Sequence, residues 1–174
     1  SQLLTQVVGA HALIIRSATQ VTPEVLEAGS DLMVVGRAGI GLDNVDVDAA
    51  TRRGVMVVNA PQSNIISAAE HTMALLLSQA RNVPQAHAAL TQGRWERSRW
   101  EGVELADKVL GIVGLGRIGK LVADRAKAFG MTIAYSNRRP VSPQIEADLG
   151  AQFMSQDELL ATSDVVSLNC PYSP

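Results

Sequence analysis

One glycine-rich segment, Gly114-Leu115-Gly116-Arg117-Ile118-Gly119, constrains the fold of this chain more than any other feature. It directly follows an apolar run at residues 109–113 and opens a stretch with helical spacing, which is the context of a dinucleotide-binding loop. In such a loop the first glycine permits a tight turn, the second lets the backbone approach a diphosphate, and the third lets helix and strand pack closely. Amides at the helix N-terminus then face the phosphates. The alternative is an ordinary glycine-rich turn between a strand and a helix.

Short apolar runs alternate with capped helical stretches along most of the chain. Strands are predicted at residues 12–15, 32–35, 55–58, 109–113, 132–135 and 165–168. Asp46 is a typical N-cap for a helix that ends at Gly54, and Ser155 with Glu158 forms the pattern of a capping box. This alternation predicts an α/β fold of doubly wound parallel sheets.

A helical segment divides the chain between its third and fourth predicted strands. A capping-box pattern at Ser67 predicts that a long helix begins there, and Pro84 is expected to end or kink this helix before a second helical stretch. The polar, bulky residues 94–104 then form a connector. The chain stops at Pro174, just after a strand, where an open parallel sheet normally continues, so we expect a truncated protein.

Composition excludes several functional classes. The 174 residues include 15 Lys and Arg against 17 Asp and Glu, so no global field would recruit nucleic acid or an anionic membrane. A single cysteine excludes an internal disulfide, and neither a long apolar segment nor a leader is visible, which favours a cytoplasmic location. The three histidines are scattered without the spacing of a metal site.

The strand after the glycine loop carries the signal for cofactor choice. At its end a carboxylate would take both ribose hydroxyls of NAD, but this chain has Ser136, Asn137, Arg138 and Arg139 there. Serine and asparagine can hydrogen-bond a 2′-phosphate, and two arginines can neutralise it. These residues favour NADP over NAD as the cofactor. The alternative is that both arginines are only solvated at a strand end.

A second cluster of polar groups follows the first two predicted strands. Arg16 and Ser17 come just after one strand, and Arg37 with the loop Gly39-Ile40-Gly41 comes after the next. Because parallel strands bring their carboxyl ends to one edge, these groups should meet where such sheets bind ligands. They suit a small acid with several negative charges. Alternatively, either arginine pairs with a surface acid such as Asp43 or Asp46.

Cys170 and Pro171 follow the last predicted strand and could line the cofactor crevice. A buried and inert thiol is the more ordinary interpretation of this cysteine.

With these motifs assembled, the chain resembles the D-2-hydroxyacid dehydrogenase family, and from Arg16 to Gly119 it is most similar to the D-3-phosphoglycerate dehydrogenases within it. The resemblance rests on the segments at residues 16–19, 36–46, 59–61, 67–71 and 114–119. It implies a Rossmann-like nucleotide-binding domain at residues 70–174, beginning with the interdomain helix, and a flavodoxin-like substrate-binding domain at residues 1–69, both incomplete. It also implies a homo-oligomer, a dimer or tetramer, for the full-length parent.

The resemblance also assigns roles to the residues. Arg16, Ser17 and Arg37 would hold the substrate phosphate and carboxylate, and the amides from Gly39 to Gly41 would orient the carboxylate. Arg117 and Ile118 would touch the diphosphate, and Cys170 with Pro171 would flank the adenine or ribose. The catalytic arginine, glutamate and histidine of the family follow the last strand, so no catalytic residue can be assigned in this chain, and the isolated chain is expected to be inactive.

One departure from the phosphoglycerate subgroup keeps a second activity open. The segment from Tyr135 to Pro140 resembles NADP-dependent glyoxylate/hydroxypyruvate reductases, and so does the segment from Asp164 to Pro174. The leading hypothesis is oxidation of 3-phosphoglycerate with NAD or NADP, in serine biosynthesis, and reduction of glyoxylate or hydroxypyruvate is the closest rival. A nucleotide-sensing corepressor is the rival from another class, which the paired arginines disfavour.

Overall fold

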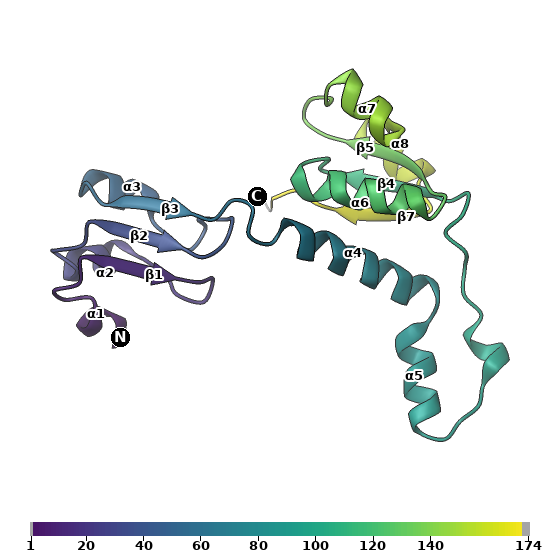
Figure 1. The fold of residues 1–174 in the computed structure, drawn as a ribbon, viewed down its shortest axis with the longest axis horizontal. Coiled ribbons are helices and arrows are strands. Elements are labelled where there is room, and N and C mark those ends of the chain that lie inside the picture. Colours follow the sequence, from purple (N-terminus) through teal and green to yellow (C-terminus); the bar gives the residue numbers. More distant parts are fainter. Residues whose placement is uncertain (1, 172–174) are drawn as a thin grey trace. The chain divides into compact units, whose positions relative to one another are not determined.

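The computed structural model describes residues 2–171 (Figure 1). Its contacts divide the chain into two compact units, Ser1–Asn64 and Ile65–Pro174. Each unit has its own apolar core, and the two cores share no residue. The division between the two compact units falls just before helix α4 (Ile65–Ala80), whose apolar residues pack in the core of the second unit.

The first unit contains a parallel sheet with the strand order β1-β2-β3. Its elements are α1 (Gln2–Gln6), β1 (Ala12–Ile15), α2 (Pro23–Ala28), β2 (Val34–Arg37), α3 (Val47–Arg52) and β3 (Met56–Asn59). Arg37 is the register partner of Ile15 on one side and of Asn59 on the other, so the carboxyl ends of all three strands form one edge. Figure 1 shows this sheet with its helices in purple and blue.

Two strands of this sheet begin later than predicted, because the backbone amides just before them donate to carbonyls at the ends of the preceding helices. The Leu32 amide donates to the Gly29 carbonyl in the turn after α2, so β2 starts only at Val34. In the same way the Val55 amide donates to the Ala50 carbonyl at the end of α3. The predicted cap of α3 is confirmed, since Asp46 accepts from the Ala49 amide at 2.7 Å.

The second unit contains a four-stranded parallel sheet with the order β6-β5-β4-β7. Its strands are β4 (Val109–Val113), β5 (Thr132–Ser136), β6 (Ala151–Phe153) and β7 (Val165–Leu168). Counted from β4, the order is 3-2-1-4, which matches four of the six strands of the doubly wound dinucleotide-binding sheet, 3-2-1-4-5-6. β5 pairs with one side of β4, and β7 pairs with the other side. The topological switch point of the sheet therefore lies at the carboxyl end of β4.

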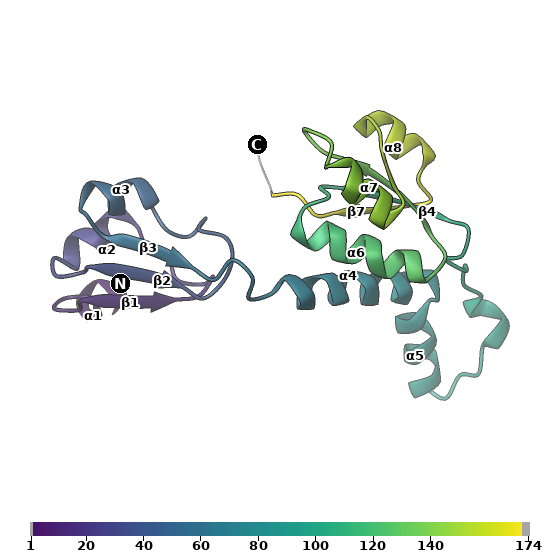
Figure 2. The same ribbon diagram turned by 45° about the horizontal axis from the view of Figure 1, so that its top comes forward.

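Helices α6 (Arg117–Ala128) and α8 (Gln156–Thr162) cover opposite faces of this sheet (Figure 2). A β-carbon on Gly111 would meet the side chain of Leu159 in α8 at 2.7 Å. The side chain of Ile112, the next residue, reaches Gly119 in α6 instead. Because successive residues of a strand point to opposite faces, this is the doubly wound arrangement that the sequence predicts.

Several element boundaries differ from the predictions. Helix α4 begins at Ile65, so Ser67 lies inside its first turn and is not its N-cap. The helical conformation is interrupted after α4 at Asn82, which adopts a left-handed conformation with φ 51°. Pro84 lies in the first turn of the next helix, α5 (Val83–Thr91), and does not end α4. Four short elements were not predicted, namely α1, β6, α7 (Pro143–Leu149) and a 3₁₀ helix in the connector after α5.

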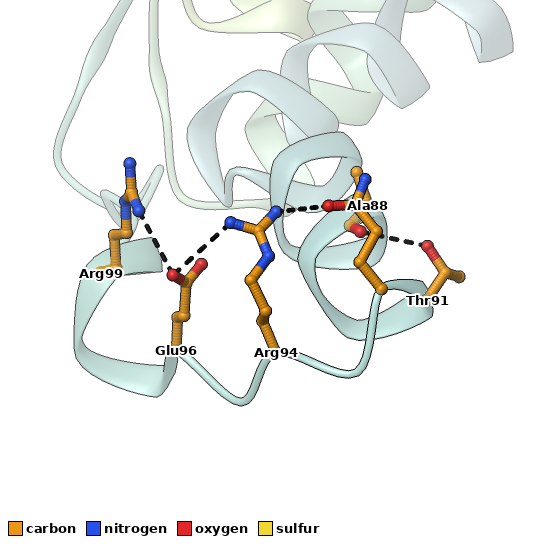
Figure 3. A network of polar contacts seen from close by, with 6 residues as sticks. Ala88, Thr91, Arg94, Glu96 and Arg99 are labelled. Atoms are coloured by element: carbon orange, nitrogen blue, oxygen red, sulfur yellow. Dashed lines mark hydrogen bonds and ion pairs between the residues drawn. The ribbon is translucent and has the colours of Figure 1, made fainter.

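The connector after α5 contains a short 3₁₀ helix, η1 (Arg97–Trp100). Glu96 accepts ion pairs from Arg94 at 3.7 Å and from Arg99 at 3.3 Å (Figure 3). Exposed ion pairs of this kind contribute little to stability, so the network mainly shapes the connector. Among residues 2–171, no helix is long and apolar enough to span a membrane.

Candidate functional site

The first glycine of the loop is required by the turn that it makes after β4. Gly114 has a φ of +96°, a region that residues with a β-carbon rarely adopt. A β-carbon there would also lie 2.8 Å from the backbone of Asn169 and Cys170, which follow β7. The tight turn therefore brings the end of β4 directly against the chain that leaves β7.

The second and third glycines serve different purposes. A β-carbon on Gly119 would meet the Gly114 carbonyl oxygen at 2.4 Å, so this glycine lets α6 pack closely on the loop. Gly116, the N-cap of α6, has nothing within 4 Å of an added β-carbon. The space beside Gly116 is thus open, as a close approach of a diphosphate to the backbone requires.

The loop is braced by the end of β5. The Gly114 amide donates to the Ser136 carbonyl at 2.9 Å, and the Leu115 amide donates to Asn137 Oδ1 at 2.8 Å. Asn137 Oδ1 is thus committed to the loop, and the group of this side chain that could donate to a phosphate is its Nδ2. From the other side, the Asn169 amide donates to the Val113 carbonyl at 2.8 Å.

A cleft of about 910 Å³ opens at the switch point beside this loop. Its size suits a cofactor. Among residues 2–171 no carboxylate lines it; the lining residues are Val113, Gly114, Leu115, Gly116, Ser136, Asn137, Arg138, Arg139, Gln156, Asn169, Cys170 and Pro171. Arg138 and Arg139 are the charged residues of this lining, so the wall that they form is positively charged and suits an anionic ligand.

Arg138 and Arg139 are both exposed on that wall, and Ser136 is half-buried at the end of β5. Within residues 2–171, neither guanidinium forms an ion pair. The two charges are thus available to a ligand, although exposure also fits the alternative that they are only solvated.

The position of Cys170 differs from the interpretation of this residue as a buried thiol. Its thiol is exposed and lines the cleft together with Pro171, so it is not a buried, inert group. Gln156 and Asn169 also line the cleft and were missed. Asn169 carried a usable signal, because it is a polar residue at the carboxyl end of a strand next to the glycine loop.

The second polar cluster lies at the carboxyl edge of the sheet in the first unit. Arg16 and Ser17 are exposed directly after β1, and Arg37 is half-buried at the end of β2 beside them. Within the described residues neither arginine pairs with Asp43, Asp46 or any other acid. The structure therefore does not show the surface ion pairs that were the alternative for these side chains.

The glycine loop at residues 39–41 is fixed against this edge. The Ala60 amide donates to the Gly39 carbonyl at 3.0 Å, and Asn59 Nδ2 donates to the Ile40 carbonyl at 2.7 Å. The Arg37 guanidinium lies over Gly39, where a β-carbon would collide with it. The Arg37 Nε is buried and has no hydrogen-bond partner among the described residues.

A buried asparagine holds the other side of this cluster. Asn44 is 3% exposed, and its Nδ2 donates to the carbonyls of Arg16 at 3.0 Å and Thr19 at 2.6 Å. It thereby fixes the loop that presents Arg16. Among residues 2–171 no cluster of histidine, cysteine or carboxylate side chains could hold a metal ion.

The sheet order, the three glycines and the cleft at the switch point together define a nucleotide-binding unit of the Rossmann type. Residues 73–174 match the sequence model of the D-isomer specific 2-hydroxyacid dehydrogenase, NAD binding domain. The chain belongs to this family of NAD-dependent oxidoreductases, which act on the CH–OH group of 2-hydroxy acids.

Individual relatives agree with this assignment. D-3-phosphoglycerate dehydrogenase of Mycobacterium tuberculosis strain H37Rv is 54% identical over 99% of this chain, and that of Sus scrofa is 45% identical. The alignments cover 33% and 32% of those two proteins, so the chain spans about a third of their length.

Solved structures show the same fold. The TT0316 protein of Thermus thermophilus superposes with a TM-score of 0.92 at 39% identity, over 99% of this chain and 55% of that one. A D-lactate dehydrogenase from Aquifex aeolicus, complexed with NAD and lactic acid, gives 0.87 at 28% identity, over 98% of this chain and 51% of that one.

Proposed function

We propose that this chain is the part of a D-3-phosphoglycerate dehydrogenase that binds the nicotinamide cofactor and recognises the anionic substrate. The observation that carries the proposal is the glycine loop, whose Gly116 leaves open space beside a cleft that no carboxylate of the described residues lines. The sequence similarity to phosphoglycerate dehydrogenases supports the choice of substrate.

The residues present fit a nicotinamide dinucleotide. The backbone from Gly114 to Gly119 and the N-terminus of α6 would hold the diphosphate, with Arg117 and Ile118 beside it. Cys170 and Pro171 would flank the adenine or its ribose on the opposite wall of the cleft. The bound cofactor supplies the hydride acceptor for the oxidation of 3-phosphoglycerate to 3-phosphohydroxypyruvate.

We further propose that the cofactor is NADP rather than NAD. Ser136 occupies the strand end where a carboxylate would repel a 2′-phosphate, and Arg138 and Arg139 lie exposed on the same wall. Among the described residues that line the cleft, a 2′-phosphate placed there would meet two positive charges and no negative one. The family contains NAD-dependent members, so this preference distinguishes the chain within its family.

Calorimetric titration of the 174-residue chain with NADPH and with NADH tests both proposals, cofactor binding and the preference for NADP. We expect NADPH to bind more tightly, and Ser136→Asp to reverse the order because its carboxylate repels the phosphate. Replacing Arg138 and Arg139 with alanine should weaken NADPH binding by roughly tenfold or more and leave NADH binding nearly unchanged.

The first unit supplies a matched control for the arginine variant. Arg52 and Arg53 are also adjacent, exposed and without ion pairs among the described residues, so their replacement by alanine should change neither affinity. If neither cofactor binds at millimolar concentration, the proposed function is wrong.

The proposed substrate site consists of Arg16, Ser17, Arg37 and the amides from Gly39 to Gly41. Two arginines at one sheet edge suit a substrate with both a carboxylate and a phosphate. In the parent protein we therefore expect kcat/KM for 3-phosphoglycerate to exceed that for unphosphorylated glycerate, and Arg37→Ala to remove the difference.

A second candidate, an NADP-dependent glyoxylate or hydroxypyruvate reductase, is favoured by the arginines at the end of β5. It predicts the opposite result, namely a preference for the unphosphorylated substrate in the same assay. We also propose, on the family resemblance, that the parent is a cytoplasmic homo-oligomer, which fractionation and light scattering can test.

A further inference from the structure

The loop that carries Arg138 and Arg139 is held at two points. At its start, Asn137 Oδ1 accepts a hydrogen bond from the Leu115 amide at 2.8 Å. At its end, the Val141 amide donates to the hydroxyl of Tyr135 at 2.9 Å. Between these two anchors lie the two exposed arginines and Pro140 alone. The loop is therefore short, and each end of it is tied to a different part of the Rossmann unit.

The second anchor is built into the core. Tyr135 lies in β5 with a relative exposure of 0%, and its ring packs against Phe153 of β6 with 5.4 Å between ring centroids. Its hydroxyl donates to Glu146 Oε1 in α7 at 2.6 Å. One buried hydroxyl thus links the end of the arginine loop to both the sheet and the next helix.

The direction of these hydrogen bonds follows from the protonation of the phenol. Burial raises the pKa of Tyr135 above its usual value of 10.0, and the hydrogen bond to Glu146 raises the pKa further. The hydroxyl is therefore protonated at neutral pH, so it donates to the carboxylate and accepts from the Val141 amide. The Tyr135 side chain is fully buried and both of its partners are half-buried, so the two hydrogen bonds shield the hydroxyl from water.

We propose that Tyr135 is a positioning residue for cofactor choice, which acts with Asn137 to hold the arginine loop by both ends and so presents Arg138 and Arg139 to the 2′-phosphate of NADP. This inference rests on the proposed function and extends it to residues that do not touch the cofactor. A loop ordered before binding loses less conformational freedom on binding, so its charges contribute more to affinity.

The two anchors have separable effects. Asn137 bonds to the glycine loop itself, so losing its oxygen disturbs the diphosphate site that NADH and NADPH share. Among the described residues, the Tyr135 hydroxyl bonds only to the far end of the arginine loop and to α7, so we expect its loss to disturb the site of the 2′-phosphate alone. A purely structural role would weaken both cofactors alike.

Measuring the dissociation constants of NADPH and NADH for Tyr135→Phe in the 174-residue chain tests the proposal. The variant keeps the buried ring and removes only the hydroxyl. We expect NADPH affinity to fall roughly three- to tenfold, the usual effect of one lost hydrogen bond, and NADH affinity to change by less than roughly twofold. Asn137→Ala should weaken both cofactors.

Ser163→Ala is the matched control. It removes a hydroxyl of the same unit that donates to the Leu159 carbonyl at 2.6 Å, on the sheet face covered by α8. We expect it to leave the ratio of the two affinities unchanged, even where it lowers thermal stability. A change in the ratio as large as that of Tyr135→Phe would overturn the proposal.

A second pair of variants covers the case in which Tyr135→Phe does not fold. Glu146→Gln keeps an acceptor for the phenol and should keep the preference for NADPH, whereas Glu146→Ala should reduce it. Equal losses for NADPH and NADH in these variants would overturn the role of Tyr135 while leaving the proposed function intact. Failure of the unaltered chain to bind either cofactor would instead refute the proposed function, and the inference with it.

Discussion

Gly114 and Gly116 are required to be glycine for different physical reasons. Replacing each of them with alanine should therefore have different effects on stability and on cofactor binding. At Gly114 an alanine would need a φ of +96° and would lie 2.8 Å from the backbone after β7. We expect Gly114→Ala to cost at least about 1–2 kcal/mol of unfolding free energy. At Gly116 an alanine meets nothing within 4 Å, so stability should fall by only about 1 kcal/mol or less, the loss of a preferred N-cap.

Cofactor binding should show the reverse order of sensitivity. The methyl of Gly116→Ala would occupy the space proposed for the diphosphate, so we expect at least a roughly tenfold weaker affinity in a chain that still melts near the original temperature. Urea denaturation and calorimetric titration measure the two quantities. An unchanged affinity in Gly116→Ala would contradict the placement of the diphosphate.

Two short helices of the second unit begin with serine, but only one of these serines caps its helix through its side chain. Ser155 accepts from the Glu158 amide, and the Glu158 carboxylate accepts from the Ser155 hydroxyl at 2.7 Å. Ser142 at the start of α7 forms no such side-chain bond. We expect Ser155→Ala to cost about 1 kcal/mol and Ser142→Ala to stay within about 0.5 kcal/mol.

The same capping box makes a prediction about pH. The hydrogen bonds from Ser155 lower the pKa of Glu158 below its ordinary value of 4.5. A carboxyl whose pKa is lower in the folded state stabilises the fold above its ordinary pKa, and this contribution is lost as the pH falls through the lowered value. In Ser155→Ala the Glu158 pKa should rise toward 4.5, which an NMR titration of the carboxyl carbon can follow. An unchanged pKa would contradict the capping geometry.

At the scale of elements, the strands and helices that could be predicted from the sequence are those marked by a local pattern of apolar and turn residues. The bounds of β1, β4 and β7 agree with the prediction, because each is an apolar run flanked by polar or turn residues. β6 has three residues, too few to show an alternating pattern. α7 carried signals that went unused, namely Pro143 at its start and Gly150 in the left-handed conformation after its end.

In the candidate site, too, the features marked by a local sequence pattern could be predicted and those that depend on tertiary packing could not. The glycine loop and the polar residues at strand ends could be placed from the sequence, because parallel strands bring their carboxyl ends to one edge. The bond between Leu115 and Asn137 and the bond between Tyr135 and Val141 could not, since each depends on side-chain packing in the folded state. The exposure of Cys170 likewise depends on where the chain turns after β7.

At the scale of the whole molecule, separate cores predict separable folding. A chain of residues 65–174 should unfold cooperatively and keep the cofactor affinity of the 174-residue chain, because its core lies wholly within it. A chain that starts at residue 73 should be less stable, since it lacks Ala69, which is 0% exposed in that core. Circular dichroism melts compare the two. A non-cooperative melt of residues 65–174 would show that the units depend on each other.

The solvent-facing thiol at the rim of the cleft offers a practical handle. Since the sequence has one cysteine, a maleimide dye would attach at Cys170 alone, without any engineered substitution. The thiol follows β7, on the other side of β4 from the arginines that follow β5, so a bound dinucleotide should shield it and slow the attachment of the dye. The rate of labelling at rising dinucleotide concentration would therefore report how much of the cleft is occupied.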